Sequence, residues 1–188
     1  MTEAVVVAMD MSFELRMQDL WNDCKAVTAM VLESVHDFSG QVPIVVGYSE
    51  TAQILNPAAL SELELDYVFG TNVQHALQLA RIALDEESGR KRVLLVAEVD
   101  PSAHCVTNDY AQFTYPPTEE TRRITLNVAR ICAIAGIRVD ILLLTPTSPF
   151  GELAKSIASE CGGSVTFLSG PRPKRGEVQA FISSIDME

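Results

Sequence analysis

The chain has 188 residues, of which 47% are hydrophobic and 21% are charged, and this composition is typical of one domain that buries a sizeable core. Its formal net charge of -11 argues against a nucleic-acid partner, because an acidic surface repels phosphate backbones. No segment approaches the roughly 20 consecutive apolar residues of a membrane span, and no export signal is evident. We therefore expect a single cytoplasmic domain over residues 1–188, without a membrane partner.

Cysteine and histidine spacing gives no indication of a zinc site. The cysteines are far apart, form no Cys-x-x-Cys pair and have no histidine at ligand spacing. They are typical of reduced thiols in a cytosolic protein, most of them packed in the core. The three histidines, His36, His75 and His104, are isolated from one another, so we expect surface or capping positions for them.

Short apolar runs alternate with segments of helical period along the whole chain. The apolar runs predict strands at 5–9, 44–46, 93–96, 139–144 and 165–168. The periodic segments predict helices at 20–35, 73–84, 119–135, 151–161 and 176–185, two of which end before a glycine, Gly136 and Gly162. Continuous β-branched runs indicate strands buried on both faces. The fold class is therefore α/β, with a doubly wound sheet covered by helices on both faces.

The loop after the first strand carries the first polar residues of interest, because ligands of such sheets bind outside the carboxyl ends of the strands. Asp10 ends the apolar run and Ser12 opens the connection to a helix. An unpaired carboxylate is costly at that position, which favours a functional origin for Asp10. No glycine follows the strand, so a nucleotide fingerprint or a phosphate-binding loop is absent. We therefore expect no nucleotide cofactor.

Three segments together resemble the von Willebrand factor A (VWA) family in order and spacing. They are Asp10-Met11-Ser12-Phe13-Glu14, Gly70-Thr71-Asn72 at the start of a helix, and Val96-Ala97-Glu98-Val99-Asp100-Pro101-Ser102 at the end of a strand. The resemblance implies a mostly parallel six-stranded sheet with one antiparallel edge strand, near Gln53. Within this family, the sequence resembles in particular the bacterial stand-alone VWA proteins that accompany AAA+ ATPases of the MoxR class.

The resemblance also implies a metal-ion-dependent adhesion site. Ser12 and Thr71 would supply hydroxyls and Asp10 a carboxylate, a donor set that suits Mg2+ or another divalent cation. The sequence departs from the family pattern twice, because Glu14 stands where a serine belongs and Glu98 where an aspartate belongs. Thr71 and Asn72 directly precede a helix, so helix capping alone explains one of them.

The two departures predict a cluster of three carboxylates, Asp10, Glu14 and Glu98. Gathered within about 5 Å, they would repel one another by several kcal/mol. Two interpretations remain open. Either a cation neutralises them and Glu14 caps it, or Glu14 points outward, Arg16 or another base pairs with the acids, and no metal binds.

The long connection after the strand at 93–96 predicts a β-hairpin at the rim. Residues 105–107 and 110–113 flank Asn108-Asp109, a pair that tolerates positive φ. Three aromatic residues, Tyr110, Phe113 and Tyr115, are therefore candidates for exposed anchors of a protein interface. Packing of the hairpin onto its own domain is the other interpretation.

These features favour a protein-binding module, not an enzyme, that acts as an adaptor with a protein partner such as an AAA+ ATPase. The alternative is a structural VWA domain whose site has decayed and whose partner binds elsewhere. A metal-dependent hydrolase is the least favoured class, because no positioned nucleophile or general base is evident.

Overall fold

The computed structural model describes residues 3–65, 67–107, 110–170, 172 and 175–185. Its main sheet has the strand order β3-β2-β1-β4-β7-β8, and every neighbouring pair is parallel except β2 and β3. The strands are β1 (Glu3–Asp10), β2 (Ile44–Tyr48), β3 (Ala52–Leu55), β4 (Arg90–Ala97), β7 (Ile137–Leu143) and β8 (Val165–Phe167). The predicted fold class is confirmed, including the antiparallel edge strand at Gln53.

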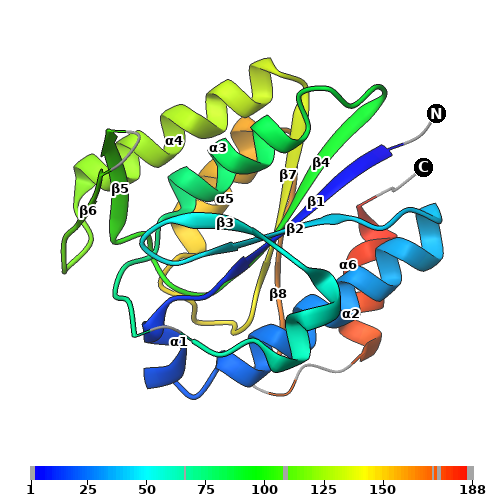
Figure 1. Cartoon of the computed structure of the whole chain (residues 1–188), viewed down its shortest axis with the longest axis horizontal. Helices are drawn as coiled ribbons and strands as arrows, with labels where there is room; N and C mark the ends of the chain where they lie inside the picture. Colours follow the sequence, from blue (N-terminus) through cyan, green and yellow to red (C-terminus); the bar gives the residue numbers. More distant parts are fainter. Residues whose placement is uncertain (1–2, 66, 108–109, 171, 173–174, 186–188) are drawn as a thin grey trace.

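Helices cover both faces of this sheet (Figure 1). One face carries α2 (Trp21–Ser39) and α6 (Arg175–Ser184), and the other carries α3 (Val73–Ala83), α4 (Glu119–Ile134) and α5 (Gly151–Glu160). Each of the five helices lies where the apolar period of the sequence predicted it. Gly136 and Gly162 follow α4 and α5 with φ of 71° and 64°, as the helix endings predicted.

Alternation along the strands divides the core into two layers. Val6 and Ala8 of β1 face α3, α4 and α5, whereas Val5, Val7 and Met9 face α2 and α6. Both sets are buried, which is why the strand is a continuous apolar run in the sequence.

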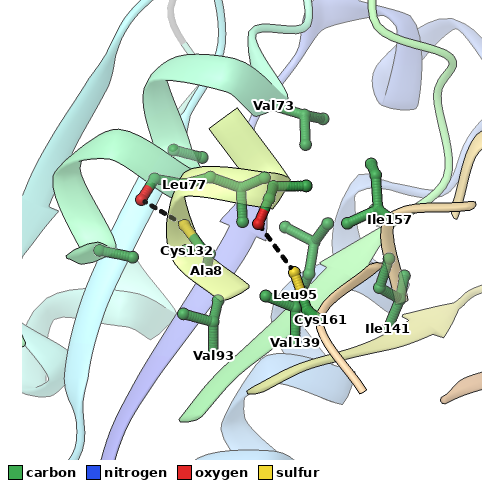
Figure 2. Close-up of a cluster of buried hydrophobic side chains, with 14 of the residues drawn as sticks. Ala8, Val73, Leu77, Val93, Leu95, Cys132, Val139, Ile141, Ile157 and Cys161 are labelled. Atoms are coloured by element: carbon green, nitrogen blue, oxygen red, sulfur yellow. Dashed lines mark hydrogen bonds between the residues drawn. The ribbon is translucent and has the colours of Figure 1, made fainter. Parts of the chain in front are cut away.

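Three of the four cysteines pack in this core, and all four are free thiols. Figure 2 shows Cys132 of α4 and Cys161 at the end of α5 within the apolar cluster on this face of the sheet, and their thiols lie 3.7 Å from the Leu77 carbonyl and 3.2 Å from the Ala129 carbonyl, respectively. Burial raises the pKa of Cys132 to about 11 and that of Cys161 to about 12, so both remain protonated. They have the packing role that the sequence predicted.

The amino edge of the sheet is closed by a buried ion-pair network. Arg92 of β4 is 2% exposed and donates to Glu3 of β1 at 2.9 Å and to Asp140 of β7. Arg138 also pairs with Asp140, and Ser164 donates to it from both its backbone and its hydroxyl at 2.8 Å. The charges at this edge are thus largely paired within the chain.

Four short elements complete the fold. The sequence did not predict α1 (Phe13–Met17) or the 3-10 helix η1 (Pro57–Glu62). The predicted hairpin is confirmed as a separate two-stranded sheet of β5 (Ala103–Thr107) and β6 (Tyr110–Phe113), while its expected turn, Asn108-Asp109, lies outside the described residues. Within the described part of the chain, no helix combines the length and apolar character that a membrane crossing requires.

Candidate functional site at the carboxyl edge of the sheet

Asp10 lies fully buried at the carboxyl end of β1. Its Oδ1 accepts the Ser12 N–H at 2.8 Å, and its Oδ2 accepts the Val99 N–H at 3.4 Å. Burial raises the pKa of Asp10 to about 6, the backbone N–H donors partly offset this rise, and the charge of Glu14 raises the pKa further. The buried Asp10 carboxylate is therefore stabilised by any positive partner, either a proton or a cation.

The hydroxyls of Ser12 and Thr71 are buried at the same edge of the sheet and have no hydrogen-bond partner among the described residues. Asn72 caps α3, because its Oδ1 accepts the His75 N–H at 2.9 Å. The backbone of Thr71 is anchored to the loop after β4, since its N–H donates to the Ser102 hydroxyl at 3.1 Å and its carbonyl accepts the Ser102 N–H at 3.1 Å. Capping therefore explains Asn72, whereas the Thr71 hydroxyl stays free for a ligand.

The donor chemistry of Asp10, Ser12 and Thr71 fits a hard divalent cation. Two unpartnered buried hydroxyls and one carboxylate are oxygen ligands of the kind that Mg2+ takes together with water. Unpaired buried hydroxyls are otherwise costly and rare. No group of three Asp, Glu, His or Cys side chains that could hold a metal occurs among the described residues, so the hydroxyls are indispensable to any such site.

Glu98 does not join this group, contrary to the predicted cluster of three carboxylates. Its Oε1 accepts the Thr145 hydroxyl at 2.5 Å and its Oε2 accepts the Thr145 N–H at 3.0 Å. Its backbone carbonyl accepts the Ser148 hydroxyl at 2.6 Å. The longer acid thus reaches the loop after β7 and holds that loop in place. Burial raises the pKa of Glu98, and the Thr145 donors partly offset this rise.

Glu14 lies in α1 and is half-buried, and its Oε2 is buried without a partner. The sequence offered Arg16 as a base that might pair with the acids, but the Arg16 guanidinium lies 5.4 Å from the centre of the Tyr67 ring. The charge of Glu14 contributes to the raised pKa of Asp10, after burial.

Two residues of the site were missed by sequence reasoning. Tyr48 pairs with Asp10 across β1 and β2 and is fully buried, and its hydroxyl has no partner. Burial and the charge of Asp10 raise the pKa of Tyr48. Asp100 gives one carboxylate oxygen to Arg122 and keeps the other buried and unpartnered. The sequence signal that could have identified Tyr48 is its position at the end of a strand that pairs with the strand of Asp10.

Exposed aromatic and apolar side chains surround a groove next to Glu14. The groove has a volume of about 610 Å³ and lies between α1 and the end of the hairpin. Phe113 is 39% exposed and Tyr115 is 76% exposed, and both line the groove, whereas Tyr110 is 62% exposed but is not among the lining residues. Phe69, which the sequence analysis did not identify, lies 6.3 Å from Phe113 between ring centres. We call this surface the aromatic groove; its lining residues are Glu14, Met17, Gln18, Phe69, Phe113 and Tyr115.

Two histidines have structural contacts that the sequence did not predict. His104 is buried, not on the surface or at a helix cap, and its Nδ1 lies 3.0 Å from the Thr121 hydroxyl, which fastens the hairpin to α4. His75 is half-buried, and its Nδ1 accepts the Ala52 N–H at 3.0 Å. Burial lowers the pKa of His75, which agrees with a neutral ring that accepts.

Comparison with known proteins gives one family match. The family described as "Rv0959-like protein, vWA domain" matches residues 3–181. Uncharacterized protein Rv0959 of Mycobacterium tuberculosis (strain H37Rv) is 28% identical over 169 residues, which cover 86% of this chain and 25% of that protein. Uncharacterized protein Mb0984 of Mycobacterium bovis matches equally well. The chain thus spans about a quarter of the length of these relatives.

Solved structures share the fold at low sequence identity. BatB of Bacteroides thetaiotaomicron superposes with a TM-score of 0.67 at 14% identity, and the match covers 98% of each chain. The SpRpn10 VWA domain gives a TM-score of 0.66 at 13% identity over 100% of this chain and 97% of that one. The PilB minor pilin of Streptococcus sanguinis, as its D319A mutant, gives 0.67 at 16% identity over 98% of this chain and 60% of that one.

Proposed function

This chain belongs to the Rv0959-like vWA family, and from this premise we propose that it is a protein-binding module whose carboxyl-edge site and aromatic groove engage a partner. VWA domains commonly mediate protein interactions. One observation carries the proposal: buried, unpartnered oxygens of Ser12, Thr71 and Glu14 lie at the edge of the sheet that also bears the aromatic groove. Unsatisfied polar groups beside exposed rings are typical of a surface completed by a ligand.

We further propose that Asp10, Ser12 and Thr71 hold a divalent cation at this edge. A bound cation would neutralise Asp10 and the neighbouring charge of Glu14. The hydroxyls would then gain the partner that they lack within the chain. Glu14 stands where the family pattern has a neutral ligand, and as a cap it would fill the coordination position that the pattern leaves open.

Replacement of Glu14 tests the cation site. Glu14→Ser restores a neutral ligand, so Mg2+ or Mn2+ should bind this variant more tightly than the parent in calorimetric titration. At a hundredfold excess over the dissociation constant, the variant should gain about 3 kcal/mol in free energy of unfolding. Thr71→Val in the same background is the control and should abolish the gain. Tighter binding by the parent would show that Glu14 is itself a ligand.

A metal-free binding module is the second candidate, and the position of Glu98 favours it. Both oxygens of this carboxylate accept hydrogen bonds from Thr145, which favours a site that does not use the third-loop acid of the family pattern. In that case Asp10 has no metal partner, and partner binding is insensitive to chelators. Thermal shift of the natural protein with Mg2+ and with EDTA separates the two candidates, because only the cation site predicts a difference.

For the partner we propose a protein of the MoxR class of AAA+ ATPases in the cytoplasm, on the resemblance of the loop residues. The test is quantitative affinity purification from cells with the natural chain and with Phe113→Ser/Tyr115→Ser. An ATPase enriched by the natural chain and lost with the double variant would support the proposal. An unchanged set of captured proteins would place the binding surface elsewhere. The matched control is Ile134→Ser, since Ile134 is 87% exposed on α4 away from the groove.

A further inference from the structure

We infer that the aromatic groove receives a basic side chain, Lys or Arg, flanked by an apolar residue, from a segment of the protein partner. The inference rests on the proposed function and specifies the chemistry of the partner.

The walls of the groove fit an apolar neighbour and a long aliphatic stem. Met17 is 71% exposed and Phe69 is 49% exposed, and both line the groove with Phe113 and Tyr115. Phe69 is held in place because its ring also lies 5.1 Å from that of Phe13. Aromatic faces of this kind attract Lys and Arg, whose stems bury apolar surface while the charged head reaches a polar group.

The polar group in the groove is an acid that forms no ion pair with any described residue. Glu14 lines the groove, and its buried Oε2 has no hydrogen-bond partner. The nearest base along α1, Arg16, lies over the ring of Tyr67. A buried carboxylate oxygen gains most from a charge-assisted donor, and Lys and Arg supply one.

Charge complementarity selects the sign of the partner. The whole chain has a net charge of -11, and Asp10 adds a second acid close to Glu14. An acidic segment would meet repulsion from both, whereas a basic one is attracted over a distance and then relieves the unpaired oxygen. A divalent cation at Asp10 would compete for Glu14, so Mg2+ should weaken basic binding.

The test uses three capped dipeptide amides, acetyl-Arg-Phe, acetyl-Gln-Phe and acetyl-Glu-Phe, titrated into the 15N-labelled protein with EDTA and with Mg2+. In EDTA, the Arg probe should bind about tenfold more tightly than the Gln probe and shift the amides of Glu14, Phe69 and Phe113. Glu14→Gln should reduce the affinity for Arg to that for Gln. Glu86→Gln is the matched control, because Glu86 is exposed in the turn before β4, and it should leave the preference unchanged. Glu14→Ser serves as the second variant if Glu14→Gln alters the fold.

Three outcomes would overturn the inference. Equal affinity of the Arg and Gln probes, or tighter binding of the Glu probe in Mg2+, would leave the edge as a protein-binding site but of a different charge preference. Amide shifts confined to residues outside the groove would show that the probes do not bind in the groove. The proposed function would still be tested separately by the affinity purification. Dimerisation that is lost with Phe113→Ser would show that a second copy of the chain occupies the groove.

Discussion

The polar residues at the carboxyl edge are buried in surroundings that are less favourable for them than water. Asp10 is an acid enclosed by β2, β4 and their loops, and burial disfavours its charge more strongly than two N–H donors favour it. Ser12 and Thr71 have hydroxyls enclosed without partners. Such groups weaken the free domain and become favourable only when a proton, a cation or a partner reaches them.

Asp10→Asn should change the pH dependence of stability. The pKa of Asp10 is raised from 3.8 to about 6 in the fold, so its contribution is fully present below pH 3.8 and is lost as pH rises through 6. Two pKa units correspond to about 3 kcal/mol. The parent should therefore lose up to about this amount, relative to Asp10→Asn, between pH 4 and pH 7.

Urea unfolding of both proteins at the two pH values measures this difference. The other acids with raised pKa, Glu98 and Asp100, are present in both proteins and cancel in the comparison. Parallel pH profiles for parent and variant would mean that Asp10 keeps its charge in the fold.

At the scale of the elements, the loop after α5 approaches β7 so closely at Gly163 that a side chain there has no space. A Cβ on Gly163 would lie 1.8 Å from the Val139 carbonyl oxygen, so Gly163→Ala must push the backbone of β7. We expect a loss of at least about 3 kcal/mol in chemical denaturation. Gly176→Ala is the control, since nothing lies within 4 Å of that position, and its effect should stay below about 1 kcal/mol. Similar values for the two variants would contradict the close approach.

The hairpin provides the second element-scale prediction. Phe113 and Tyr115 are exposed, so replacing both by serine should lower the free energy of unfolding by no more than about 1 kcal/mol. His104→Ala should cost more, because it removes a buried ring that is bonded to Thr121 and joins the hairpin to α4. Thermal and urea unfolding of both variants checks this order. A larger loss for the serine pair would place the aromatic residues in the core and not in an interface.

At the scale of the whole molecule, the two edges of the sheet differ in how their polar groups are paired. The amino edge pairs Arg92 with Glu3 and Asp140, whereas at the carboxyl edge the hydroxyls of Ser12 and Thr71 and one oxygen of Glu14 have no partner among the described residues. Arg92→Met leaves two buried acids without their shared partner and should cost about 3–5 kcal/mol, with no change in ligand binding by properly folded protein.

Thr71→Val removes an unpaired hydroxyl and should raise stability by up to about 1 kcal/mol while abolishing binding at the carboxyl edge. Denaturation and ligand titration of both variants test this separation, and a stability loss for Thr71→Val would show that its hydroxyl is already satisfied.

The sequence by itself determined the order of strands and helices along the chain, because strands buried on both faces form continuous apolar runs and amphipathic helices repeat apolar residues with a period of 3.6. It also placed Asp10, Ser12 and Thr71 at strand ends and helix starts that meet at one edge. The tertiary structure alone decided where the long side chains point. Glu98 reaches Thr145, Arg16 lies over Tyr67, and Phe69 joins the hairpin aromatics. Such contacts depend on loops far apart in the chain, and no local period records the rotamer that each side chain adopts.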